Sequence, residues 1–337
     1  MKFSTTRVSS SELNEDNYVS TENMLQDFQG IVEAKSVPED VNVISFSCGD
    51  ILISNIRPYL KKVWKASFNG GCSSDVFVLQ ANDNIESDYL HYVVANDKFI
   101  NFVMSGAKGV KMPRGDKNQM KTYSLSLPQI QEQYKIAKLL SLLDERIATQ
   151  NKIIDKLQSL IKGIAQNIAC NNKPNVRLSD CLKCSSSTLQ ESDVNEQGIY
   201  PVYGANGIVG YLDNYNTEGE AVYIIKDGSG VGTVSYVTGK CSATGTLNTL
   251  QAKEGYSLQY LYYMLKVFSF EPYKTGMAIP HIYFKDYGKA KIFCPTYTKQ
   301  LQYARLLSAI DNKLSTEQMI LTNLGLQKQD LLRQMFI

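Results

Sequence analysis

Apolar side chains recur every seven residues along two long segments of the chain. Residues 129–170 contain no proline, and apolar residues occupy heptad positions a and d there and again in 298–337. A repeat held over several heptads predicts two helices that pair along a coiled-coil seam, each roughly 60 Å long. The alternative is two helices packed separately on their own domains. The predicted seam residues are Leu140, Leu143, Ile147, Ile154, Leu157, Ile161 and Ile164, and Leu307, Ile310, Leu314, Leu321, Leu324 and Leu331.

Polar residues interrupt this predicted seam. Gln150 and Glu317 fall at d positions, and Lys328 falls at an a position. Polar side chains in a seam lower stability but can fix the register of the two helices. They also occur where a coiled coil meets another element, so both explanations are open from the sequence.

The second half of the chain repeats the first. Residues 133–144 recur without a gap as residues 300–311, a separation of 167 (300 minus 133). Self-similarity of this kind predicts two equivalent modules. Looser matches lie upstream: Ser105-Gly106 with Thr275-Gly276, Pro113 with Pro280, and Cys72-Ser73 with Cys241-Ser242.

The stretch ahead of each long helix mixes strand and helix signals, which predicts an α+β fold. The runs rich in β-branched and aromatic residues, expected as strands, are 50–54, 75–79, 199–203, 220–225 and 232–237. Segments 87–103 and 257–268 are each expected as one helix, and Asn69-Gly70-Gly71 and Asn206-Gly207 as turns. The predicted division is a first module at 1–128, a long helix at 129–170, a linker at 171–175, a second module at 176–297 and a long helix at 298–337.

Composition narrows the class of protein only slightly. The chain has 337 residues, with 35 Lys and Arg against 33 Asp and Glu, so its net charge of +2 neither requires nor excludes nucleic acid. The seven cysteines are irregularly spaced, the first residues lack an apolar run, and no stretch is apolar enough to span a membrane. These features predict a cytoplasmic protein with reduced thiols and no membrane association.

Catalytic and metal-binding patterns are missing from the sequence. The two histidines, His91 and His281, are too few for most hydrolytic or metal sites. Cys181 and Cys184 have zinc-ligand spacing but no second pair, so we expect ordinary thiols. The glycine-rich run 228–233 leads into a predicted strand rather than a helix, which favours a hairpin over a phosphate-binding loop. We therefore predict no metal and a non-catalytic protein.

Several segments, in this order, resemble the specificity (S) subunits of type I restriction–modification systems. In the first module these are 49–59 (GDILISNIRPY) and 105–111 (SGAKGVK), and in the second 200–211 (YPVYGANGIVGY) and 243–249 (ATGTLNT). The stretch from 131–137 (QEQYKIA) into the heptads resembles the first conserved helix of the family.

The resemblance implies a fold, a function and partners. The modules would be two target-recognition domains, related by a pseudo-two-fold axis and separated by two antiparallel helices that form an intramolecular coiled coil. Each would read one half of an asymmetric, bipartite site in double-stranded DNA. Two methyltransferase subunits and restriction/motor subunits would bind this chain. They would carry S-adenosylmethionine, Mg and ATP, because this chain itself is expected to bind no cofactor.

The first module departs from the second in the length of its opening segment. It has 17 residues before Tyr18, whereas 24 residues (176–199) precede Tyr200 in the second. No counterpart of 176–180 is evident near Met1, so we expect a shortened first module.

Loops that mix cations with glycine are the candidate DNA contacts. Arg114 has a side chain suited to a bidentate contact with guanine, and Asn206 one suited to adenine, while lysines would neutralise phosphates. Each has a simpler explanation: a solvated turn, a protected strand edge, or an Asn-Gly turn. The candidates are Arg57, Lys61, Lys62, Lys108, Lys111, Arg114 and Lys117 in the first module, and Tyr203, Asn206, Lys274 and His281 in the second, with Lys285 nearby.

Two other functions remain compatible with the sequence. One is the DNA-reading component of a related, fused restriction–methylation enzyme. The other is a coiled-coil scaffold that joins protein partners without binding DNA.

Overall fold

The computed structural model describes residues 2–276 and 279–336, and it contains two compact units. Unit 1 holds the described residues up to Thr149 and those from Leu321 onward, and unit 2 is Gln150–Ile320. Each unit therefore combines one globular part with pieces of both long helices. The sequence-based division of the chain, whose end residues Met1 and Ile337 lie outside the described residues, remains our proposal.

A four-stranded antiparallel sheet forms the centre of unit 1. Its strand order is β1-β8-β5-β6. Helix α1 (Ser87–Val94) packs against it, and Ile51, Tyr89 and Val93 lie in the resulting core. The strand bounds are β1 (Lys2–Phe3), β5 (Ile51–Ser54), β6 (Val63–Lys65) and β8 (Val76–Gln80).

A second sheet in unit 1 has the order β2-β4-β7-β3, and its β3–β7 pair is parallel. The predicted turn at Asn69-Gly70-Gly71 is wrong, because both glycines lie in β7. A Cβ on Gly70 would come within 2.1 Å of the Asn17 carbonyl oxygen, so glycine serves here for close strand approach. The strand bounds are β2 (Arg7–Ser9), β3 (Tyr18–Val19), β4 (Asn42–Phe46) and β7 (Gly70–Cys72).

Unit 2 repeats the central sheet but not the outer strands. Its order β10-β16-β13-β14 matches β1-β8-β5-β6, and the pair Ile51–Leu79 recurs as Val222–Leu250. In the three-stranded sheet β12-β11-β15, the parallel β11–β15 pair corresponds to β3–β7, but a hairpin strand replaces β2 and β4. The strand bounds are β10 (Leu182–Ser186), β11 (Tyr200–Gly204), β12 (Gly207–Leu212), β13 (Ala221–Ile225), β14 (Val234–Val237), β15 (Ser242–Ala243) and β16 (Leu247–Ala252).

Backbone hydrogen bonds and backbone conformations that recur in both modules show that two of the looser sequence matches are misaligned. The amide of Ser73 donates to Val19 as the amide of Thr244 donates to Tyr203, so Ser73 corresponds to Thr244 rather than Ser242. Gly276 has the left-handed backbone of Gly109, not the conformation of Gly106. Loops of unequal length between the modules shift the true register by two or three residues at these points.

The helices next to the sheets differ between the modules. Segment 257–268 forms one helix, α6 (Leu258–Val267), as predicted. Segment 87–103 does not, because α1 ends at Val94 and Asn96 caps the start of a second helix by accepting a hydrogen bond from the Lys98 amide. The remaining short helices are α2 (Asp97–Ser105), α3 (Lys117–Lys121), α7 (Phe284–Tyr287), η1 (Ser10–Glu12), η2 (Pro58–Leu60), η3 (Glu191–Asp193) and η4 (Glu271–Tyr273).

An opening element of the second module has no counterpart in the described part of the first. Strand β9 (Val176–Arg177) pairs with β17 (Lys291–Ile292), and α5 (Leu178–Cys181) leads into β10. In unit 1, strand β1 is the counterpart of β10 and begins at Lys2. Residues 123–129, which correspond in the repeat to the segment around β17, form no strand.

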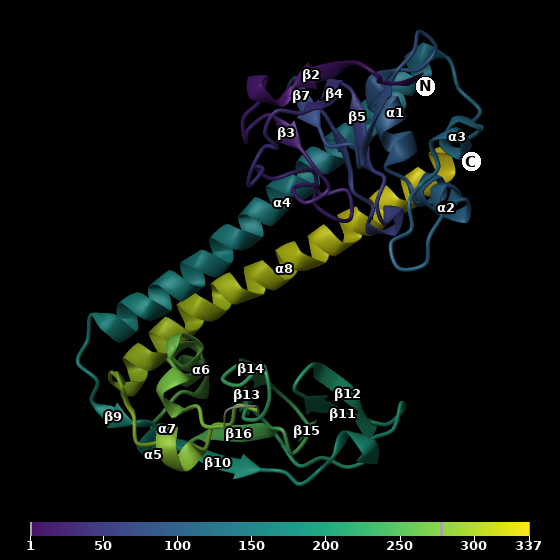
Figure 1. Cartoon of the computed structure of the whole chain (residues 1–337). Helices are drawn as coiled ribbons and strands as arrows, with labels where there is room; N and C mark the ends of the chain where they lie inside the picture. The colour runs from purple at the N-terminus through teal and green to yellow at the C-terminus, as the bar shows by residue number, and fades with distance from the viewer. Residues whose placement is uncertain (1, 277–278, 337) are drawn as a thin grey trace. The chain divides into compact units, whose positions relative to one another are not determined.

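The two long helices, α4 (Ile130–Cys170) and α8 (Tyr297–Met335), pack against each other in both units (Figure 1). Each predicted seam residue is buried or half-buried. The polar interruptions are partnered: the Gln150 amide donates to the Glu317 carboxylate in unit 2, and Lys328 pairs with Asp144 in unit 1. The prediction of a paired, antiparallel coil is thus confirmed, and the alternative of separately packed helices is wrong.

Residues repeated between the modules attach each long helix to its own globular part. The Gln133 side chain accepts from the Glu86 amide at 2.9 Å, as Gln300 accepts from the Ser257 amide at 2.9 Å. The Tyr92 hydroxyl donates to Asp144, and the Tyr263 hydroxyl donates to Asp311. The repeated Gln and Asp residues are therefore explained by structure.

Candidate nucleic-acid interface

Backbone hydrogen bonds join two cationic loops of unit 1. Residues 108–114, which we call tip loop 1, close through paired bonds of 3.0 and 2.9 Å between Lys108 and Arg114. The Pro113 carbonyl accepts from the amide of Arg57, in the loop between β5 and β6, at 2.8 Å. The structure thus brings together Arg57, Lys108, Lys111 and Arg114, which the sequence predicted as separate groups.

Unit 2 has a loop that is closed in the same way. Thr275 and His281 close residues 275–281, tip loop 2, through bonds of 2.9 and 2.7 Å, although residues 277 and 278 lie outside the described residues. The Pro280 carbonyl accepts from the Gly228 amide at 3.0 Å. Because the two loops share this backbone frame, the repeat extends to the predicted DNA-contacting segments.

The cations of tip loop 1 are exposed to different degrees. Lys108 is 83% exposed although its ammonium lies 3.2 Å from Asp116, and Lys111 is exposed without a partner among the described residues. The Gln119 amide, with the Lys108 ammonium, lowers the pKa of Asp116. Arg114 is bound to Asp75 at 2.8 Å. Lys111 is therefore free to meet an anion, Lys108 is largely exposed but paired with Asp116, and the guanidinium of Arg114 is held by Asp75.

Arg57 has an unusual backbone conformation. Its φ is 48°, in the left-handed region, and Gly228 stands at the equivalent place in unit 2 with a φ of 97°. A non-glycine residue there is strained by about 1–2 kcal/mol. The side chain is exposed and has no partner within the described residues.

Three further predicted cations of unit 1 have internal partners. Lys61 forms an ion pair with Asp97 at 2.8 Å, and the Lys62 ammonium donates to the Thr21 carbonyl at 2.6 Å. Lys117 lies 4.8 Å from the centre of the Phe3 ring. These contacts stabilise the module, which makes the three residues weaker candidates than Arg57 and Lys111.

The candidates of unit 2 lie on two separate loops. Lys274 pairs with Glu271, and the His281 Nδ1 lies 2.7 Å from Asp227 Oδ1 in tip loop 2. Lys285 lies over the Tyr283 ring. Tyr203 and Asn206 belong instead to the β11–β12 hairpin, where Asn206 is exposed and Tyr203 packs against Tyr223.

Sequence reasoning missed the apolar tips and the acidic partners of these loops. Val110 is fully exposed, and Met112 and Ile279 are 47% and 58% exposed. Asp75 and Asp227, which hold the bases of the loops, are distant from them in sequence. The repeat pointed to both loops, but exposure and long-range ion pairs cannot be read from the repeat.

Cysteine and glycine patterns that suggested chemistry have structural explanations. Run 228–233 connects β13 to β14, as predicted. Cys181 is buried, and a hydrogen bond with Cys294 together with burial raises the pKa of Cys181. Within the described residues, no three His, Cys, Asp or Glu side chains gather as a metal site would require. In that same part of the chain, no helix is long and apolar enough to span a membrane.

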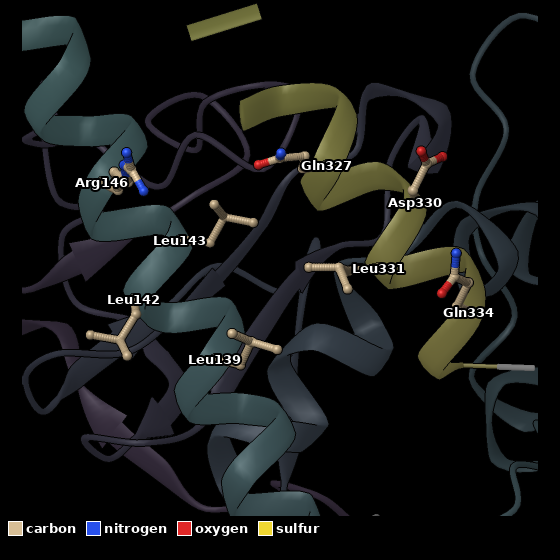
Figure 2. A pocket seen from close by; sticks show the side chains of 8 residues that line it. All are labelled: Leu139, Leu142, Leu143, Arg146, Gln327, Asp330, Leu331 and Gln334. Atoms are coloured by element: carbon tan, nitrogen blue, oxygen red, sulfur yellow. The ribbon is translucent and has the colours of Figure 1, made fainter. Parts of the chain in front are cut away.

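A groove runs between α4 and α8 in unit 1. Figure 2 shows Leu139, Leu142 and Leu143 of α4 along one side and Leu331 of α8 facing them. Leu139 and Leu142 are about half exposed. Arg146, Gln327, Asp330 and Gln334 complete the lining. This side of the paired helices therefore presents an apolar strip edged by charges.

Comparison with known proteins accounts for the repeat. The family model described as "Type I restriction modification DNA specificity domain" matches residues 5–159 and again residues 172–324. The chain belongs to this family.

Curated members of the DNA specificity family match only part of the chain. The specificity subunit of the type I restriction enzyme EcoprrI from Escherichia coli is 28% identical over 116 residues, 34% of this chain and 29% of that protein. The MjaVIII specificity subunit from Methanocaldococcus jannaschii is 34% identical over 100 residues, 29% of this chain and 23% of that protein. The chain thus matches less than a third of the length of these relatives.

Solved structures extend the likeness to the whole fold. The S subunit of a type I restriction–modification system from M. genitalium has a TM-score of 0.67 at 18% identity, covering 98% of this chain and 96% of that one. A chain from a study of complex assembly and conformational transition in a type I system has a TM-score of 0.56 at 17% identity, covering 99% and 98%. These likenesses show that the fold of two modules and two long helices is shared with both solved structures.

Proposed function

We propose that the chain is the non-catalytic DNA-specificity subunit of a type I restriction–modification complex and recognises an asymmetric, bipartite site. The observation that carries the proposal is the duplicated module with altered outer strands. Both modules keep the central sheet and a tip loop, but β2 and β4 in one are replaced by β12 in the other. Related scaffolds with different outer surfaces are suited to reading two different half-sites.

The exposed cations support DNA as the ligand. Arg57, Lys108 and Lys111 lie on two loops of unit 1 joined by backbone hydrogen bonds, and Arg57 and Lys111 have no partner among the described residues. Cations of this kind neutralise phosphates and release counterions, which makes binding depend on salt. We assign phosphate contacts to these three residues and keep Arg114, Asn206 and His281 as candidates for contacts with bases.

The paired helices offer a place for methyltransferase subunits. The exposed Leu139 recurs in the repeat as Leu306, which is 50% exposed, and Ile130 recurs as Tyr297, also 50% exposed. Two equivalent apolar faces suit two copies of one partner. We infer that each face binds one methyltransferase subunit, that restriction/motor subunits join this complex, and that S-adenosylmethionine, Mg and ATP are bound by the partners.

Methylome sequencing tests the proposal. A strain that carries the methyltransferase should lose one bipartite methylated motif when this chain is deleted and regain it when the chain is restored. Loss of the motif together with a separate methyltransferase that co-purifies with the chain would also exclude a fused restriction–methylation enzyme. An unaltered methylome would overturn the proposal and favour the scaffold.

A further inference from the structure

Both tip loops expose apolar side chains. Val110 is fully exposed, Met112 is 47% exposed, and Ile279 of tip loop 2 is 58% exposed. In sequence, Gly109-Val-Lys-Met112 corresponds to Gly276-Met-Ala-Ile279, so both modules carry large apolar residues after the glycine. Exposed apolar side chains repeated at the same place indicate a contact with another molecule.

The loop glycine and the residue after the loop proline are held in the same way in both loops. Gly109 and Gly276 have φ values of 95° and 89°, and a Cβ on Gly276 would come within 2.3 Å of the Ile279 carbonyl oxygen. The residue after each loop proline binds an aspartate, Arg114 with Asp75 and His281 with Asp227. Different side chains thus keep the same frame at the base of both loops. Tip loop 1, which is ordered before binding, loses less entropy on binding.

The charges beside tip loop 1 favour a polyanion as the molecule that it contacts. Lys108 and Lys111 flank Val110, and the exposed Arg57 lies in the loop bonded to Pro113. An apolar tip among cations is the arrangement found where proteins enter a groove of DNA. The apolar side chain itself gains nothing from phosphate, so its contact in a groove is with base pairs, for example with a thymine methyl group.

We propose that exposed apolar side chains of the two loops determine sequence specificity. Val110 and Met112 lie against base pairs of one half-site and Ile279 against base pairs of the other, while the neighbouring cations of tip loop 1 hold phosphates. This inference rests on the proposed function. It assigns Val110 and Met112 to one half-site and Ile279 to the other.

Binding by the full chain in complex with its methyltransferase tests the inference. The probes are a duplex carrying the site found by methylome sequencing and an unrelated duplex of equal length. The double variant Val110→Ser/Met112→Ser should bind the duplex that carries the site about tenfold more weakly. Its affinity for the unrelated duplex and the salt dependence of its binding should not change. Val41→Ser is the matched control, because Val41 is 44% exposed elsewhere in the first module. Ile279→Ser and its control Ile199→Ser test the second half-site.

A lysine of the same loop should behave differently. Lys111→Gln should lower the salt slope by about one unit with little change in preference between the duplexes. The inference is overturned if Val110→Ser/Met112→Ser keeps the wild-type preference, or if it weakens binding to both duplexes equally. Loss of methyltransferase co-purification with unchanged preference would show that the tip faces a protein, which also overturns it. If the wild-type chain binds both duplexes equally well, the proposed function itself is wrong, and the inference that rests on it is overturned with it.

Discussion

At the scale of single residues, burial and pairing separate side chains that look alike in the sequence. Of the cations predicted to bind DNA, Lys61, Lys62 and Lys117 stabilise the first module, whereas Arg57 and Lys111 face outward without partners among the described residues. Which cation is free depends on contacts between residues far apart in the chain. The sequence could therefore predict which loops contain cations for DNA binding, but not which of those cations are free to bind it.

His91 should make the stability of unit 1 depend on pH. Burial lowers its pKa to about 4; the charges of Lys328 and Lys65 act in the same direction, and those of Asp144 and Asp88 oppose it. Because the folded pKa lies below the unfolded one, the unfolded chain binds more protons below about pH 6.5, and stability falls as the pH drops toward 4. We expect a loss of about 3 kcal/mol between pH 7 and pH 4.

Urea unfolding at several pH values measures this effect. His91→Phe should remove the contribution of this residue and flatten the pH dependence relative to the wild type. Parallel pH profiles for the two proteins would contradict the assignment.

Arg57 should lower the stability of the protein while contributing to DNA binding. Arg57→Gly relieves the left-handed strain and should stabilise the protein by up to about 1 kcal/mol while lowering the salt slope of DNA binding by about one unit. Arg57→Lys is the matched control, since it keeps both the charge and the strained backbone. A glycine variant that binds DNA with the wild-type salt slope would remove Arg57 from the interface.

At the scale of elements, the sequence predicts what is periodic and misses what is not. The heptads predicted α4 and α8, and β-rich composition predicted β5, β8, β11, β13 and β14. The break at Asn96 and the strand β7 through Gly70 were missed, because a capping side chain and close strand approach override local propensity. The different outer strands of the two modules also depend on pairing between distant segments.

The buried pair Gln150–Glu317 should fix the register of the paired helices. Gln150→Leu leaves the Glu317 carboxylate without the amide donor and should lower the unfolding midpoint. Gln150→Leu/Glu317→Leu should recover most of this loss, because an apolar pair needs no donor. Gln158→Leu, on the exposed side of α4, is the control. Thermal unfolding of all four proteins is the measurement, and a double variant weaker than the single one would contradict this role.

The apolar strip on the helices should be needed for the methyltransferase partner. Leu139→Glu places a charge on an exposed position, so the fold should survive while co-purification of the methyltransferase falls. Leu306→Glu tests the repeated face in the same way. An exposed leucine outside the described groove, Leu326, provides the control for the substitution. Full co-purification of the Leu139 and Leu306 variants would place the partner elsewhere.

At the scale of the whole molecule, duplication accounts for our proposal that one chain addresses two DNA sequences. Equivalent glutamines and aspartates attach α4 and α8 to their modules, so the frame is the same in both units. The difference lies in the outer strands and in the tips of the loops. The order of the modules was predictable from the repeat. In our proposal the identity of the two half-sites depends on side-chain geometry at those outer strands and tips, which the repeat does not specify.

Exchange of one module tests most directly whether each module reads its own half-site. The second module, residues 176–297, is replaced by that of another member of the family, and the methylated motif is read by sequencing. We predict that one half of the motif changes and the other half stays as it was. A motif in which both halves change together, or neither does, would contradict independent reading by the two modules.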